Sequence, residues 1–434
     1  MRIAYFLRSL DFLFVRENGN ELFAIVPENS EEEKLAKKEL NLKNILPIKL
    51  KRKKNFSEFT CEEIIKYSDL LKKLKDFKID CLFIRNSNPF LQNWSLKNKV
   101  VLLIPSYQIQ KKFENKIYFE RFLRKSKLAH IKSEILNSKK TLLPFPKTVI
   151  QSPTSTGGEG TFVVNTQGFF KKVFRKLRLP LLAREYKEGL PLSSSIFIKD
   201  KKVYLTSIER QCYLKAKEEN RFGLFIGIQW LPYNFFLPRI YQDIESNLLE
   251  IGVNLEKFNL SGLINLDFVL DKEGNVNFLE CNPRIACATN QIMAIKELKN
   301  GKNFLKLLLS HYVKSFKYES QTSRERLPKS LFAGSQMFIY FPNFVNFPRK
   351  IKRFKPGGFF ILRNSTLEKI KLNNRFDFLK LKNGLFYYNE INKGEIYNEN
   401  VQIGTVISNF PLYNFETGNF NKEGEIVYRF FHRK

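Results

Sequence analysis

The sequence lacks any long apolar segment. No run approaches the roughly 20 consecutive apolar residues that a membrane-spanning helix requires. Residues 1–18 are interrupted by Arg8, Asp11 and Arg16 and lack the small-residue cleavage site of a secretory signal. We therefore expect a cytoplasmic, soluble protein with no membrane partner.

Cysteine and histidine are also scarce. Five cysteines and three histidines are scattered along 434 residues, and no two cysteines form a Cys-x-x-Cys pair. This spacing argues against a zinc site and a disulfide framework, in agreement with a reducing compartment. No Ser-His-Asp or Cys-His arrangement for nucleophilic catalysis stands out.

Acidic residues are outnumbered: 74 Lys and Arg face 43 Asp and Glu, a net charge of +31. Such a charge suggests nucleic acid as a partner. The lysines, however, are spread through every segment instead of forming one stripe, so nucleic acid is not the expected partner. An acidic substrate or cofactor is served equally well. A nucleic-acid-binding protein stays a third alternative, which predicts affinity that falls steeply with salt.

The length and composition predict several subdomains with substantial cores, since 43% of residues are hydrophobic and 14% aromatic. We expect an α/β (α+β) fold class. Residues 1–112 read as a Rossmann-like α/β domain, with buried parallel strands at 22–26, 81–84 and 100–104 and a helix at 61–76. Residues 113–325 begin with a helix at 114–127 and continue with hairpins and helices. Residues 326–434 form a strand-rich C-terminal subdomain.

A glycine-rich hairpin is predicted at residues 146–164. A β-branched strand leads into a Ser, Thr and Gly loop and out into a second such strand. Gly157, Gly158 and Gly160 allow close backbone approach, so that successive N–H groups can face an anion. A Walker loop would instead lead from strand to helix and carry Gly-Lys-Ser/Thr. The segment is either a flap over phosphates or an ordinary long turn.

An acidic hairpin is predicted at residues 263–284, where two alternating strands flank the turn 271–275. If the hairpin folds symmetrically about Glu273 and Gly274, Asp267 lies opposite Glu280 and Asn282 shares their face. Directly opposed like charges repel. A hard cation bridging ATP phosphates would remove this repulsion, and oxygen ligands suit magnesium. The alternative is a solvated hairpin, which the many apolar residues of both strands disfavour.

The two hairpins, in this order, resemble the ATP-grasp superfamily, in particular its branch of amino-acid and peptide ligases. The expected order also includes an α/β domain, a helix beginning at Asn115-Lys116 and a hinge strand at 181–189. The sequence Glu280-Cys281-Asn282-Pro283-Arg284, which ends the acidic hairpin, is the most specific part of this resemblance. It covers residues 110–310 and implies the ATP-grasp fold.

The resemblance also implies roles for individual residues. Asp267, Glu280 and Asn282 would bind Mg2+ (or Mn2+) that bridges the phosphates of ATP, while the three glycines close over those phosphates. Arg284 would stabilise an acyl phosphate or anchor a carboxylate through a bidentate fork. A further set would surround the nucleotide: Lys147 on the flap strand, Glu185, Tyr186 and Lys187 in the hinge, and one basic residue, Arg210 foremost among Arg210, Lys215, Lys217 and Arg221, at the γ-phosphate.

Two positions depart from the family pattern. Gln151 stands where a lysine often precedes the glycine loop, and Pro191 stands where an acidic residue often holds the ribose. Glu188 is a candidate substitute for the latter.

The activity implied is ATP-dependent ligation of a small-molecule carboxylate to an amine, through an acyl phosphate, in a protein for which a homodimer is a common arrangement. The alternatives are a nucleotide-binding regulatory or scaffold protein without ligation activity and, less favoured because no carrier domain is found, a biotin-carboxylase-like enzyme.

Overall fold

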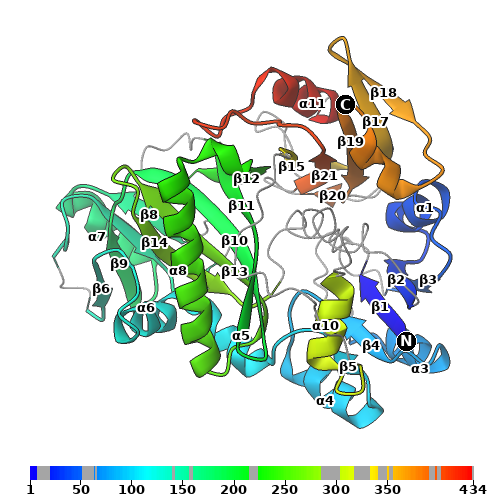
Figure 1. The fold of residues 1–434 in the computed structure, drawn as a ribbon, viewed down its shortest axis with the longest axis horizontal. Helices are drawn as coiled ribbons and strands as arrows, with labels where there is room; N and C mark the ends of the chain where they lie inside the picture. The colour runs from blue at the N-terminus through cyan, green and yellow to red at the C-terminus, as the bar shows by residue number, and fades with distance from the viewer. Residues whose placement is uncertain are drawn as a thin grey trace.

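The N-terminal part of the chain folds around a parallel sheet (Figure 1). Its strands, in spatial order, are β3 (Ile45–Ile48), β2 (Glu21–Pro27), β1 (Arg2–Phe6), β4 (Cys81–Phe83) and β5 (Val101–Leu102). Helices α1 (Glu31–Lys38), α3 (Ser68–Asp76) and α4 (Pro89–Asn98) accompany it. Ile3, Ala4 and Leu82 are fully buried, as expected for strands covered on both faces. The predicted α/β unit is confirmed, although β1 and β3 were not predicted.

The computed structural model describes residues 1–6, 20–50, 63, 66–138, 142–155, 160–214, 223–284, 304–316, 333–340, 349–350, 355–390, 396–397 and 402–432. Most of the first turns of the helix predicted at 61–76 lie outside these ranges, and the described helix begins at Ser68. None of the described helices combines the length and the apolar character needed to cross a bilayer.

The single helix predicted at 114–127 is two helices, α5 (Tyr107–Glu114) and α6 (Lys116–Lys125). Asn115 separates them because its backbone is extended and its side chain accepts hydrogen bonds from the backbone N–H groups of Ile117 and Tyr118. This N-cap satisfies donors that the first helical turn leaves unpaired. It fixes where α6 begins and therefore where Lys116 lies.

A small antiparallel sheet contains the glycine-rich hairpin. Its spatial order is β6 (Ser133–Leu136), β9 (Leu181–Glu185), β7 (Thr148–Gln151) and β8 (Thr161–Val164). Helix α7 (Gln167–Lys176) packs on it through Phe170 and Val173, which share a core with Ile150 and Leu181. This unit lies to one side of the molecule, next to α6 and β14 (Figure 1).

A ten-stranded sheet forms the centre of the molecule. Its first half, in spatial order, is β14 (Val276–Asn282), β13 (Gly262–Asp271), β10 (Gly189–Lys199), β11 (Lys202–Leu214) and β12 (Leu224–Trp230). Helix α8 (Pro238–Lys257) covers one face, where Ile251 shares a core with Ile196, Ile208 and Ile264. The opposite face of these strands carries the acidic hairpin's polar residues.

The C-terminal strands extend this same sheet through the pairing of β12 with β15 (Ser335–Tyr340). Beyond β15 follow β21 (Gln402–Ser408), β19 (Gly384–Asn389), β17 (Gly358–Arg363) and β18 (Thr366–Ile370). The remaining described elements are α10 (Phe304–Tyr312), α11 (Lys422–His432), the strand pair β16 (Arg349–Lys350) and β20 (Ile396–Tyr397), and 3-10 turns at Tyr233–Phe235 and Arg375–Lys380. The expected strand-rich C-terminal part is confirmed, and its strands form the second half of the central sheet.

We predict that Gly227→Ala weakens the junction of the two halves of this sheet. Gly227 has φ +142°, and a Cβ there would lie 2.0 Å from the carbonyl oxygen of Gln336 on β15. We expect a loss of about 2 kcal/mol or more, seen as a lower midpoint of thermal unfolding. Gly168→Ala is the matched control, because no atom of the described residues lies within 4 Å of its Cβ position on α7. Equal midpoints for the two variants would contradict this account.

Candidate active site

The acidic hairpin pairs as its turn predicts. Asp267 on β13 lies opposite Glu280 on β14, and Asn265 lies opposite Asn282. The predicted register is therefore confirmed for these pairs. Closer to the turn the register shifts by one residue, after Asp267, so that Phe268 pairs with Phe278. This bulge keeps both phenylalanines in the core beneath the two carboxylates.

Three side-chain amides surround the Asp267 carboxylate. Gln211 and Asn265 donate to its Oδ1 at 2.8 and 3.1 Å, and Asn282 donates to its Oδ2 at 3.2 Å. Burial, together with the negative charge of Glu280, raises the pKa of Asp267 from 3.8 to about 7. The folded chain thus holds two carboxylates closer than their charges favour.

Lys116 forms an ion pair with one of these carboxylates, with its Nζ 3.3 Å from Glu280 Oε1. The same Nζ donates to the carbonyl oxygen of Ser155 at 2.6 Å, and the backbone N–H of Lys116 donates to Pro153 at 2.9 Å. Lys116 therefore ties the acidic hairpin to the glycine-rich loop. No role in the site was predicted for Lys116. The available signal was its place at the first position of a helix, where a lysine opposes the helix dipole.

The glycine-rich loop is closed at its base. The backbone N–H of Ser152 donates to the carbonyl of Gly160 at 3.1 Å. Gly160 has φ +67°, and a Cβ there would lie 2.8 Å from Ser152 Oγ, so this position requires glycine. Gly157 and Gly158 lie outside the described residues.

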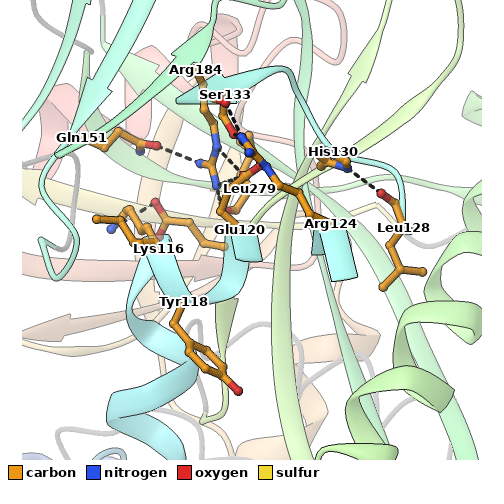
Figure 2. Close-up of polar contacts among 12 residues, drawn as sticks. Lys116, Tyr118, Glu120, Arg124, Leu128, His130, Ser133, Gln151, Arg184 and Leu279 are labelled. Atoms are coloured by element: carbon orange, nitrogen blue, oxygen red, sulfur yellow. Dashed lines mark hydrogen bonds and ion pairs between the residues drawn. The ribbon is translucent and has the colours of Figure 1, made fainter. Parts of the chain in front are cut away.

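Behind the loop, Gln151 is held by a buried ion pair (Figure 2). Arg184 on β9 donates to Gln151 Oε1 at 2.8 Å and to Glu120 Oε2 on α6 at 3.1 Å. Arg184 and Glu120 are 1% and 0% exposed. Sequence reasoning missed both. The signal was an arginine directly after the apolar run Leu181-Leu182-Ala183, since a buried charge needs a partner.

The hinge residues lie beside the start of the flap strand. Lys147 Nζ sits 3.6 Å from the ring centroid of Tyr186, whose backbone N–H donates to the Lys147 carbonyl at 2.8 Å. Lys187 forms a pair with Glu185 at 3.5 Å. These contacts bring together a cation and an aromatic face next to the loop.

Glu188 and Pro191, the two positions named for a ribose contact, come shortly after β9. Glu188 pairs with Lys272 at 2.9 Å, and both side chains are about two-thirds exposed. Pro191 on β10 pairs with Val269.

Arg284 lies at the end of the acidic hairpin and is buried. Its Nε forms an ion pair with Glu114 on α5, and its Nη2 donates to Asn282 Oδ1 at 3.2 Å. Asn282 is therefore oriented between Arg284 and Asp267. The Arg284 guanidinium therefore lies beside one of the metal-ligand candidates, Asn282.

Gln110 links the end of the acidic hairpin to the segment that follows β4. Gln110 on α5 donates to the Pro283 carbonyl at 3.3 Å and accepts from the backbone N–H of Ser87 at 2.9 Å. Among the described residues, the buried atoms Asn86 Oδ1, Ser87 Oγ and Asn88 Nδ2 have no hydrogen-bond partner. These residues follow β4, at the carboxyl edge of the parallel sheet, where α/β folds bind ligands.

Arg210 does not join the acidic hairpin. Gln211 beside it reaches Asp267, and successive strand residues point to opposite faces. Arg210 instead donates to the carbonyl of Phe415, and burial lowers the pKa of its guanidinium. Its placement gives no support to the γ-phosphate contact expected from the sequence. Lys215, Lys217 and Arg221 lie outside the described residues.

The donor set at the hairpin suits magnesium bound together with a nucleotide. In the described parts of the chain, no group of three or more His, Cys, Asp or Glu side chains gathers to hold a metal. Two carboxylates and an amide oxygen are too few for a closed protein cage. Magnesium is usually held by one or two carboxylates, with phosphate oxygens and water as its other ligands. The residues therefore fit the metal when ATP is present.

Comparison with known proteins identifies the class. Residues 113–288 match the ATP-grasp domain family. The structure also resembles the biotin carboxylase–β-γ-ATP complex from Campylobacter jejuni (TM-score 0.63, 11% identity, 94% of this chain and 86% of that chain). An L-amino acid ligase from Bacillus licheniformis is similar over 99% of this chain and 96% of its own (TM-score 0.58, 13% identity).

A phosphoribosylamine–glycine ligase from Thermotoga maritima gives a TM-score of 0.57 at 15% identity, with 94% and 92% of the two chains covered. No curated protein sequence matches the chain. The match assigns residues 113–288 to the ATP-grasp domain family, and the structure has the ATP-grasp fold. Identities this low show the fold alone.

The raised pKa of Asp267 predicts how a substitution changes stability with pH. Because the pKa is higher in the folded state, ionising Asp267 costs stability; the cost grows from about pH 4 to pH 7 and is complete above. Glu280→Gln removes a charge that contributes to this pKa shift. Without metal, the unfolding midpoint of the variant minus that of wild type should therefore increase from pH 5 to pH 8, by at least about 2 °C.

Glu273→Gln is the control for this measurement, since Glu273 lies exposed in the turn of the same hairpin. Its midpoint relative to wild type should stay constant across that range. A difference for Glu280→Gln that does not change with pH would show that the two carboxylates do not interact.

Proposed function

We propose that the protein is an ATP- and magnesium-dependent ligase that activates a small-molecule carboxylate and joins it to an amine. One observation carries this proposal. Asp267 and Glu280 oppose each other on one face, and Lys116 connects Glu280 directly to the backbone of the glycine-rich loop. A polyphosphate with its metal is the ligand that would satisfy both the acidic pair and the loop.

In the proposed site, Asp267, Glu280 and Asn282 would hold the metal, which would neutralise phosphate charge. Lys116 and the N–H groups of the loop would face the phosphates. Lys147 and Tyr186 lie on the flap and hinge, where they would contact the nucleobase. Charge neutralisation and positioning of this kind account for most of the catalysis of phosphoryl transfer.

The proposed reaction has two steps. The substrate carboxylate attacks the γ-phosphorus of ATP, a P–O bond breaks, and ADP leaves with formation of an acyl phosphate. The amine then attacks the acyl carbon and inorganic phosphate leaves. Arg284, which donates to Asn282, would neutralise the carboxylate or the acyl phosphate. The unpartnered polar atoms of residues 86–88 make the neighbouring loop a candidate contact for the second substrate.

An L-amino acid ligase and a phosphoribosylamine–glycine ligase share this fold, so the fold accommodates ligation. The likeness to a biotin carboxylase keeps a carboxylase as an alternative. A protein that binds the nucleotide without ligation is the other alternative. Gln151 replaces the expected lysine, and its side-chain oxygen already accepts a hydrogen bond from Arg184.

The test is release of ADP from ATP and magnesium in the presence of pools of amino acids, dipeptides and small carboxylic acids. We expect ADP only when a carboxylate and an amine are both present. ADP release that requires bicarbonate would favour the carboxylase. Nucleotide binding without ADP release from any pool would favour the non-catalytic protein.

Glu280→Gln should reduce ADP release by about 100-fold or more, since it removes a charge that acts on the reacting phosphates. The variant should remain folded, as judged by circular dichroism. Glu273→Gln, the same change in the turn of that hairpin, should keep wild-type activity. Near-normal turnover by Glu280→Gln would remove this residue from the metal site.

A further inference from the structure

We propose that Arg184 is a positioning residue for the nucleotide site and that it acts by orienting the side-chain amide of Gln151. This inference rests on the proposed function, because it assigns a role within the same site. Arg184 lies in β9, just before the hinge, and no part of it needs to touch the nucleotide.

Arg184 contacts three separate elements (Figure 2). Its Nε and Nη2 donate to Glu120 Oε2 on α6 at 3.3 and 3.1 Å. Its Nη1 donates to Gln151 Oε1 on β7 at 2.8 Å, and Nη2 also donates to the Leu279 carbonyl on β14 at 2.9 Å. One guanidinium therefore joins the small sheet to the helix and to the acidic hairpin.

Each of these three elements carries a group of the proposed site. Lys116 lies one turn before Glu120 on α6. The glycine-rich loop begins directly after Gln151, and Glu280 directly follows Leu279. A planar fork with five N–H donors can hold three such partners at once, whereas a lysine ammonium is a point charge without that geometry. The geometry, and not the charge alone, explains an arginine here.

The contact also decides which end of the Gln151 amide is offered to a ligand. Because Oε1 accepts from Arg184, the amide nitrogen points away from the guanidinium. Gln151 ends β7 at the base of the loop, so its N–H groups are the part available to an acceptor on the nucleotide. The residue would act as a neutral donor whose direction Arg184 fixes.

Arg124 provides a matched control. It pairs with the same carboxylate, through Glu120 Oε1 at 3.2 Å, and its other described contacts are with Ser133. Its side chain is 44% exposed and touches neither Gln151 nor β14 in the described contacts. Arg124→Lys and Arg184→Lys therefore make the same chemical change on the two sides of Glu120.

The experiment is calorimetric titration of a non-hydrolysable ATP analogue with magnesium into wild type, Arg184→Lys, Arg124→Lys, Gln151→Leu and the double variant Arg184→Lys/Gln151→Leu. We expect Arg184→Lys and Gln151→Leu each to weaken binding by about 10-fold, the effect of one lost hydrogen bond. The double variant should be no weaker than Arg184→Lys, because both changes remove the same oriented donor. Arg124→Lys should stay within about 2-fold of wild type.

The outcomes separate the two proposals. Failure of the wild type to bind would overturn the proposed function itself. Wild-type binding with an unchanged affinity for Arg184→Lys would overturn this inference alone, as would effects that multiply in the double variant. If Arg184→Lys does not fold, Gln151→Glu is the variant that tests the assignment. Its carboxylate still accepts from Arg184 but lacks the N–H groups that would donate to the nucleotide. We expect weak nucleotide binding with wild-type stability, and unchanged affinity would refute the assignment.

Discussion

The carboxylates of Asp267 and Glu280 face each other across one hairpin, and much of the site is arranged around their repulsion. Three amides donate to Asp267, and Lys116 compensates Glu280 from a different element. Burial, together with that repulsion, raises the pKa of Asp267. Folding alone gives no reason to place two acids in this way. A shared cation gives one, which is why strained titratable groups of this kind mark functional sites.

The central sheet makes this arrangement possible because its two faces differ. On one face, Ile264, Leu266 and Ile208 pack beneath α8. On the other, Ser195 donates to Asn265, which in turn donates to Asp267. Because side chains alternate between the two faces along a strand, the same strands carry both the apolar and the polar side chains. The C-terminal strands continue the same sheet, so the acidic hairpin lies at one edge of a ten-stranded platform.

Local patterns predicted the parts of the site that depend on local geometry. The opposition of Asp267 and Glu280 follows from the turn and the period of two, and the strands at 81–84 and 100–104 follow from their apolar runs. The period of two would also have placed Arg210 on the face opposite Gln211. The bulge after Asp267 was not predictable, because core packing of Phe268 and Phe278 sets it.

The remaining features depend on residues far apart in the sequence. Arg184 meets Glu120 and Leu279, which are 64 and 95 residues away. Lys116 meets Glu280. The local sequence gives only one sign of each contact. For Arg184 it is a charge in an apolar strand, and for Lys116 it is a charge at a helix start. Pairing of β12 with β15 is likewise set by tertiary packing, so the sequence predicted strands beyond residue 326 without predicting that they extend the central sheet.

A crystal structure with Mn2+ and a non-hydrolysable ATP analogue tests the central claim most directly. Manganese replaces magnesium at oxygen-ligand sites and can be located by its anomalous scattering. The account predicts a manganese peak in contact with both Asp267 and Glu280, with the phosphates between this pair and the loop that begins at Ser152. A nucleotide bound elsewhere, or manganese away from the two carboxylates, would contradict it.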